Sequence, residues 1–192
     1  MKMNAVVILS LSLLLTSLPA AAKKIGDVLI PDTLALPNSG HELLLNGAGI
    51  RKKFFMDIYI GALYLPASKS DSAAILADTG ATSVLMHFLY KEVGKDKIVE
   101  GWNDGLRENI SSSEFQAMAE RLEQFNALFK TVRKGDVIRI DYSPDAGTEV
   151  RINNEWRGSV KGNDFFRALL SIWLGEHPVS RSLKNEMLGL ED

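Results

Sequence analysis

Arg51 and Tyr59 carry the most distinctive side-chain chemistry in this sequence. Arg51 follows the segment Asn-Gly-Ala-Gly-Ile over 46–50 and begins a basic triplet that ends at Lys53. The planar guanidinium of an arginine turned into a cavity would hold a carboxylate or a phenolate through two hydrogen bonds. Tyr59 lies eight residues later in the mostly apolar run 54–65, and this even spacing would place both side chains on one face of an unbroken strand. A carboxylate or phenolate site is therefore one interpretation of this pair.

The same residues also fit purely structural roles. Arg51 in a basic triplet is consistent with a solvent-exposed cation, and a buried tyrosine ordinarily needs only one hydrogen-bond partner. Asp57 would lie on the same face of the strand, and an ion pair between Arg51 and Asp57 would neutralise the site. These alternatives stay open when the residues are considered alone.

Familiar catalytic and cofactor motifs are missing from the sequence. Gly47-Ala-Gly49 lacks the third glycine and the following helix of a dinucleotide-binding fingerprint, and there is no phosphate-binding loop or Gly-x-Ser-x-Gly elbow. The histidines His41, His87 and His177 do not have metal-ligand spacing. The chain has no cysteine, which excludes disulfides, thiolate nucleophiles and cysteine-ligated metals. We therefore expect neither a cofactor nor a metal.

The N-terminal segment predicts export from the cytoplasm. Residues 1–22 have the features of a cleaved signal peptide: Lys2 near the start, an apolar stretch over 5–18, and small residues before a cleavage site near Ala22. The apolar stretch is shorter than the ~20 residues needed to cross a bilayer, so we expect no stable membrane span after cleavage. The predicted location is the periplasm or the medium, and residues 23–192 are expected to form one domain.

The charge of the chain limits its partners. The sequence has 22 basic and 24 acidic residues, and removal of Lys2 with the leader leaves 21 basic residues and a net charge of −3. Nucleic-acid binding calls for a basic patch or stripe. We therefore expect no nucleic-acid partner.

Apolar alternation and turn residues predict two β-rich regions. The expected strands are 28–30, 42–45, 50–65, 83–90, 137–142 and 148–152. Asn153-Asn154 suits a type I′ hairpin turn because asparagine tolerates positive φ better than most residues.

Helical periodicity follows each β-rich region. Apolar residues at every fourth position over 98–110 predict one helix. A capping box formed by Ser111 and Glu114 begins a second, which is expected to reach Phe129. Asn163 and Ser180 are expected to cap two further helices. Segregated strands and helices indicate an α+β fold, with a layer of helices on one face of a mainly antiparallel sheet.

Three segments carry a resemblance to a known family. Gly47-Ala-Gly-Ile-Arg51, the run 58–65 (Ile-Tyr-Ile-Gly-Ala-Leu-Tyr-Leu) and the segment 174–184 (Leu-Gly-Glu-His-Pro-Val-Ser-Arg-Ser-Leu-Lys) resemble the chalcone isomerase superfamily. The resemblance covers roughly 44–189 and is strongest to bacterial, signal-bearing members. It implies an open-faced β-sandwich, in which a cleft lies between a large antiparallel sheet and a helical layer. The superfamily contains both enzymes and non-catalytic fatty-acid binders.

The resemblance gives Arg51 and Tyr59 specific roles. Arg51 falls on the arginine that stabilises a phenolate in the plant enzymes, which close that oxygen onto an enone. Tyr59 falls where those enzymes have a threonine that helps to polarise the ketone, and a tyrosine would occupy space needed by the flavonoid rings. The pairing of arginine with tyrosine resembles the plastid fatty-acid-binding members, in which both side chains hold a carboxylate.

Further ligand contacts are expected from the helices. Ile172 and Trp173 fall near a threonine-containing substrate-contact segment of the enzymes, and here that segment is apolar and large. The helix over 97–109 is expected to contribute Trp102 and Asn103. Apolar residues of the sheet would complete the cavity for a ligand tail, namely Phe55, Leu63, Met86 and Phe88.

The resemblance therefore favours a periplasmic, non-catalytic binder of a fatty acid or another small amphipathic carboxylate, whose acidic head is held by Arg51 and Tyr59. The first alternative is an isomerase, an intramolecular lyase in which Arg51 stabilises a phenolate and Tyr59 donates to the ketone. The second is an envelope scaffold or accessory protein whose cavity is filled by aromatic side chains and an Arg51–Asp57 pair.

Overall fold

The computed structural model describes residues 22–37 and 39–190. The predicted signal peptide lies outside the described residues, apart from Ala22 at the start of the first strand. Within the described ranges, no helix is both long enough and apolar enough to span a membrane.

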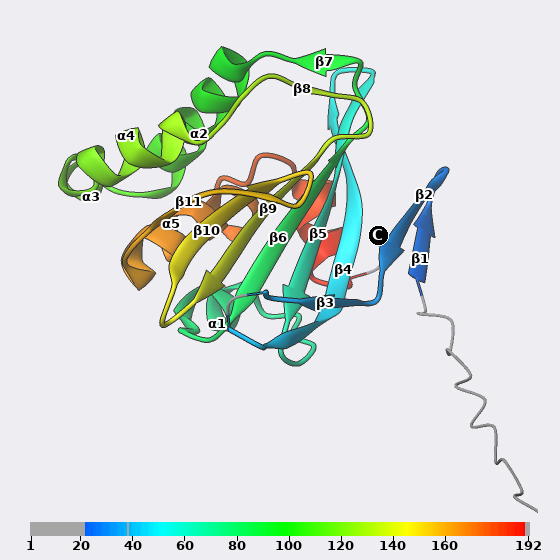
Figure 1. Cartoon of the computed structure of the whole chain (residues 1–192), viewed down its shortest axis with the longest axis horizontal. Helices are drawn as coiled ribbons and strands as arrows, with labels where there is room; N and C mark the ends of the chain where they lie inside the picture. Colours follow the sequence, from blue (N-terminus) through cyan, green and yellow to red (C-terminus); the bar gives the residue numbers. More distant parts are fainter. Residues whose placement is uncertain (1–21, 38, 191–192) are drawn as a thin grey trace, which may run out of the picture.

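Seven strands form one antiparallel sheet in the order β11-β10-β9-β6-β5-β4-β3 (Figure 1). Their bounds are β3 Thr33–Ala35, β4 Glu42–Lys53, β5 Met56–Leu65, β6 Thr82–Phe88, β9 Val137–Ser143, β10 Gly147–Ile152 and β11 Glu155–Val160. Two short two-stranded antiparallel sheets lie outside this sheet. One is the hairpin of β1 Ala22–Ile25 and β2 Val28–Pro31, and the other pairs β7 Glu92–Val93 with β8 Val132–Arg133, which α2, α3 and α4 separate in the chain.

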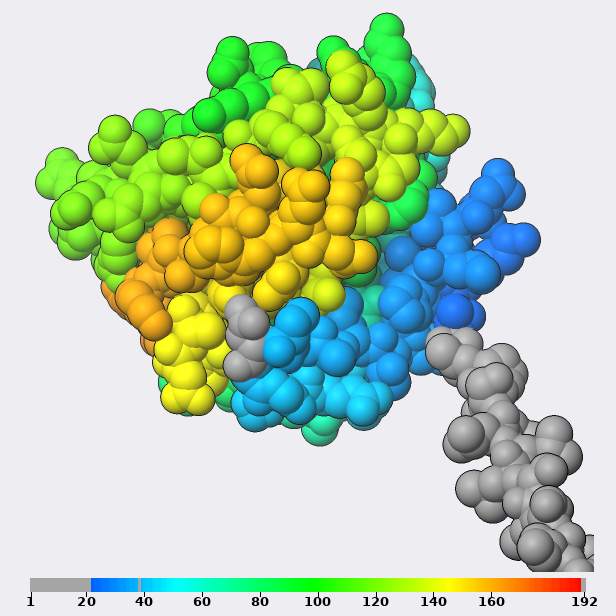
Figure 2. Space-filling view, in the orientation of Figure 1, coloured from blue at the N-terminus to red at the C-terminus, as the bar shows by residue number. Residues whose placement is uncertain are grey.

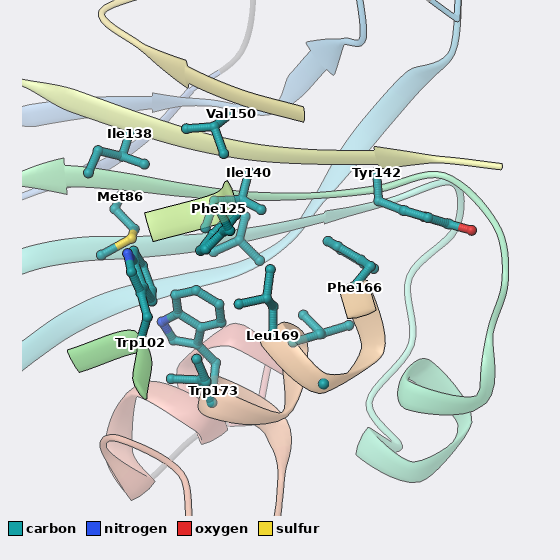
Figure 3. Packing of buried hydrophobic residues seen from close by; sticks show 14 of the residues in the cluster. Met86, Trp102, Phe125, Ile138, Ile140, Tyr142, Val150, Phe166, Leu169 and Trp173 are labelled. Carbon is teal, nitrogen blue, oxygen red and sulfur yellow. The ribbon is translucent and has the colours of Figure 1, made fainter. Parts of the chain in front are cut away.

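The helices pack on one face of the sheet and form the larger core with it. They are α1 Ser72–Ala77, α2 Lys95–Asn109, α3 Ser112–Ala117, α4 Ala119–Ala127, α5 Asn163–Leu174 and α6 Arg181–Met187. Figure 3 shows the apolar side of α5 beneath strand residues such as Ile140 and Val150. This arrangement confirms the expected α+β class and the helical layer on one face.

The opposite face of the sheet is covered in part by the N-terminal strands. Ile30 and Leu34 pack there against Ile60 and Tyr64 of the sheet, and the Tyr64 hydroxyl donates to the carbonyl oxygen of Pro31 at 2.9 Å. The space-filling view shows the N-terminal segment, in blue, against this side of the molecule (Figure 2). Successive side chains of β5 point to opposite faces of the sheet, so the strand contributes to two hydrophobic cores, one on each face.

The single strand predicted over 50–65 is wrong, because the chain reverses direction within it. β4 ends at Lys53 and β5 begins at Met56, with Phe54 and Phe55 in the turn. Phe54 has a φ of 56°, a left-handed conformation that bulky residues rarely adopt. No glycine or asparagine marks this turn, so apolar alternation continues through it without a signal. The predicted strand 42–45 is the first part of β4.

Local capping signals place most helix starts correctly. The capping box between Ser111 and Glu114 is formed, and Ser180 accepts a hydrogen bond from the backbone of Leu183 at 3.3 Å. Asn163, however, is the first helical residue, and Gly162 is the N-cap with a φ of 107°. The helix expected from Ser111 to Phe129 is divided into α3 and α4 at Met118 and ends at Ala127.

Gly47 and Gly49 serve packing rather than phosphate binding. A Cβ atom at Gly47 would overlap the backbone carbonyl of Glu186 and lie 2.8 Å from that of Met187, both in α6. The Asn46 side-chain amide also donates to the carbonyl of Met187 at 2.8 Å. The glycines therefore let α6 lie directly on β4.

Candidate functional site

A cleft of about 760 Å³ lies between the inner face of the sheet and α2. Its floor and walls include Ile58, Met86 and Phe88 from the strands and Ile98 from α2. The segment 176–179 and Arg181 close another side. The cleft therefore lies between strands β4, β5 and β6 on one side and the helical layer on the other.

Arg51 and Tyr59 face this cleft from neighbouring strands. They are cross-strand partners in the β4–β5 hairpin, and the guanidinium carbon of Arg51 lies 5.7 Å from the centre of the Tyr59 ring. The Nε atom of Arg51 is buried and has no hydrogen-bond partner within the described chain. A buried donor of this kind is costly to leave unpaired.

Tyr59 is held so that its hydroxyl proton is available. Its side chain is only 5% exposed, and its Oη accepts a hydrogen bond from Trp173 Nε1 at 3.0 Å. Burial raises the pKa of Tyr59 above 10.0, although the Arg51 charge and the Trp173 hydrogen bond oppose the shift. Tyr59 therefore remains protonated at neutral pH, and its O–H bond can donate because its oxygen already accepts from Trp173.

Trp102 forms an aromatic wall beside this pair. It is 4% exposed and lies in the lining of the cleft, and its ring centre lies 5.8 Å from that of Trp173 in an edge-to-face arrangement. Figure 3 shows the two indoles next to each other, with Met86 close to Trp102. The Nε1 atom of Trp102 is a second buried donor without a partner in the described residues.

The structure brings most of the predicted site residues together. Arg51, Tyr59, Trp102 and Ile172 line the cleft. The predicted tail residues Met86 and Phe88 line it too. Trp173 instead lies behind the site, where it holds the hydroxyl of Tyr59.

Other predicted residues lie elsewhere. Asn103 is not in the cleft lining, and its Oδ1 accepts a hydrogen bond from Asn126 at 3.2 Å. Leu63 is fully buried in the core behind the lining. Phe55 is fully exposed at the β4–β5 turn, so its assignment to the cavity is wrong, because the turn carries it away from the inner face. The proposed Arg51–Asp57 pair is also wrong, since Asp57 pairs with Lys52 at 3.8 Å.

The sequence did not reveal the charged rim of the cleft. Lys53 and Arg181 lie on it together with acidic residues of α2 such as Glu100, and Lys97 donates to Glu100 at 2.6 Å. Exposed charges follow no apolar period, so only the fold identifies them as rim residues. The described residues contain no group of three histidine, aspartate or glutamate side chains placed to hold a metal ion. Arg51, Tyr59 and Trp102 together offer hydrogen-bond donors beside an apolar wall.

Comparisons with known proteins agree with this architecture. The crystal structure of a fatty-acid binding protein from Arabidopsis thaliana matches with a TM-score of 0.59 and 17% sequence identity, over 81% of this chain and 95% of that chain. At this identity the likeness shows the fold alone. No curated protein matches the chain. A family model described as chalcone isomerase-like matches residues 22–189, and the chain therefore belongs to the chalcone isomerase-like family.

Proposed function

We propose that this protein is a non-catalytic periplasmic binder of a fatty acid or another amphipathic carboxylate. The observation that carries the proposal is the buried Nε of Arg51, which has no partner among residues 22–37 and 39–190, beside the available hydroxyl proton of Tyr59. Both groups are donors, and a carboxylate has only acceptors to offer them. Charge-assisted bonds of this kind are stronger than bonds between neutral groups.

The apolar lining suits the tail of the same ligand. Met86, Phe88, Trp102 and Ile172 line the cleft beside the donor pair. Its volume of about 760 Å³ lies within the range of roughly 300–1,000 Å³ that is usual for small-molecule sites. The fatty-acid-binding activity named for the Arabidopsis structure and the predicted signal peptide support the ligand class and the compartment.

The proposal is tested first by identifying what the protein carries. We expect native mass spectrometry of protein purified from the periplasm, followed by organic extraction, to find a carboxylic acid in a stoichiometric complex. In solution, decanoate should bind at least tenfold more tightly than decanol, because only the acid makes charge-assisted bonds to Arg51. Equal affinity for acid and alcohol would show that the donor pair does not select the ligand. An empty protein that takes up no decanoate but closes a chalcone ring would favour the isomerase.

The pH dependence of binding follows from the protonation of both partners. Below the carboxyl pKa of about 4–5 the ligand is neutral, so decanoate affinity should fall as the pH is lowered through that range. Because burial raises the pKa of Tyr59 above 10.0, its proton stays in place and affinity should be constant from neutral pH to about pH 9. Isothermal titration calorimetry measures both limits, with decanol as the pH-independent control. A loss of affinity between pH 7 and 9 would contradict the assigned role of Tyr59.

A further inference from the structure

The turn between β4 and β5 exposes a contiguous apolar tip at the mouth of the cleft. Phe54 is 82% exposed, Phe55 is fully exposed and Met56 is 39% exposed. Single exposed apolar residues are common, but adjacent large ones indicate an interaction surface. Neither phenyl ring has an aromatic or cation–π partner among the described residues. We propose that this tip docks the protein on an anionic lipid bilayer.

The backbone of the tip is not explained by the turn itself. Phe54 adopts a φ of 56°, and the β10–β11 turn of the same sheet reaches similar values with Asn153 and Asn154. Asparagine tolerates this left-handed region, whereas a bulky aromatic residue is strained in it. An asparagine or glycine would adopt this conformation with less strain, so local turn chemistry does not account for a phenylalanine at this position.

The charge around the tip complements an anionic surface. The segment 89–91 is tied to β5, because the backbone amides of Leu89 and Tyr90 donate to the carbonyl of Ile58 at 2.9 and 3.1 Å. The backbone amide of Lys134 in turn donates to the carbonyl of Lys91 at 3.3 Å. Figure 1 shows the tip and the paired strands β7 and β8 at the same end of the molecule.

The three segments at this end have an excess of positive charge. Residues 52–57, 89–93 and 132–136 contain five basic residues and three acidic ones. The pairs Lys52–Asp57 at 3.8 Å and Arg133–Glu92 at 2.9 Å cancel within this set, which leaves Lys53, Lys91 and Lys134 against Asp136. Basic residues beside exposed aromatic rings are typical of proteins that bind anionic lipid surfaces. This combination favours an anionic bilayer as the partner.

Docking through the tip would bring the cleft to the membrane. Met56 of the tip and the neighbouring Lys53 line the cleft, and Arg51 precedes Lys53 by two residues in β4. The acidic residues of the rim, such as Glu100, belong to α2. The hydrogen bond from Lys97 lowers the pKa of Glu100 most, and the charge of Lys53 helps to lower it. An acyl chain could then pass between bilayer and cleft without crossing water. This last step rests on the proposed function, whereas docking does not.

Vesicle co-sedimentation of the mature protein tests the docking. We expect binding to vesicles of phosphatidylglycerol and phosphatidylethanolamine, weaker binding to phosphatidylcholine alone, and loss of binding at high salt. The double variant Phe54→Gly/Phe55→Ser should bind at least tenfold more weakly and unfold at an equal or higher temperature, since glycine removes the strain. The charge variant Lys91→Glu/Lys134→Glu should also bind at least tenfold more weakly. Leu29→Ser, which removes an exposed apolar residue of β2, is the matched control and should bind like the wild type.

Decanoate binding in solution separates the two proposals. The tip variant should bind decanoate within about twofold of the wild type, because the donor pair is unchanged. A wild type that binds decanoate but no vesicles would overturn the docking and leave the proposed function intact. Binding to vesicles without binding of decanoate would support docking and remove the proposed function. Wild-type binding that is equal on anionic and zwitterionic vesicles, or unchanged in the tip variant, would also overturn the docking.

Discussion

Arg51→Ala is expected to weaken decanoate binding by about 30-fold to more than 1,000-fold, because removing one partner of a desolvated charge pair costs roughly 2–5 kcal/mol. The free energy of unfolding should change by less than about 1 kcal/mol, since the variant also removes a buried donor that has no partner in the described chain. Isothermal titration calorimetry and urea unfolding measure the two quantities.

Lys53→Ala is the matched control for Arg51→Ala. Lys53 is two residues further along the same strand and lies on the rim of the cleft, but it is exposed to solvent. Its charge is screened, so its removal should change affinity less than about threefold. An Arg51→Ala variant that behaves like Lys53→Ala would show that the guanidinium does not hold the ligand.

Two substitutions by phenylalanine separate the contribution of Tyr59 to decanoate affinity from that of Trp173. Tyr59→Phe removes the hydroxyl donor and should weaken decanoate binding about 2- to 12-fold, the value of a neutral hydrogen bond of about 0.5–1.5 kcal/mol. Trp173→Phe keeps the hydroxyl but removes the bond of 3.0 Å that orients it. It should weaken binding less than Tyr59→Phe does, and the reverse order would contradict the positioning role of Trp173.

Gly47→Ala is expected to lower the free energy of unfolding by about 3 kcal/mol, at the upper end of the usual cost of overpacking. The added methyl would meet the backbone carbonyls of Glu186 and Met187, and backbone atoms cannot rotate away as a side chain can. The helix is also held in place by the bond from Asn46 to Met187. For a chain of this size the melting temperature should fall by roughly 6–12 °C, which circular dichroism measures.

Gly101→Ala provides the contrasting glycine substitution. Gly101 lies inside α2, and a Cβ atom there would meet no other atom within 4 Å. Alanine favours the helix, so this variant should be more stable than the wild type by about 0.5–1 kcal/mol. If Gly47→Ala were as stable as the wild type, α6 would not be seated on β4 as the structure places it.

Local signals in the sequence predict the structure correctly where the interaction joins residues a few positions apart. The capping box of Ser111 and Glu114, the cap at Ser180 and the Asn153-Asn154 turn were all predicted and are all formed. In the two caps the side chain that accepts from the backbone belongs to the same turn of chain, and the turn forms because asparagine tolerates positive φ. Such contacts require no knowledge of the rest of the fold.

The β4–β5 turn shows a chain reversal that local signals in the sequence do not predict. Arg51 and Tyr59 were expected on one face of a single strand, and they do share a face, but as cross-strand partners in a hairpin. Phe54 and Phe55 extend the apolar pattern through the turn, and neither is a residue type that marks a reversal. The undetected turn also explains why Phe55 lies outside the cavity and why Asp57 pairs with Lys52 and not with Arg51.

The sequence by itself determined the chemistry available to this protein: one arginine and one tyrosine near apolar strands and helices, without cysteine or a cofactor motif. Only the tertiary structure decided how that chemistry is presented. Trp173 lies 114 residues from Tyr59, yet its hydrogen bond leaves the tyrosine proton available. Burial, orientation and an unpaired donor at Arg51 arise when α2 and α5 pack on the sheet. They depend on contacts between distant segments, which no local pattern of residues encodes.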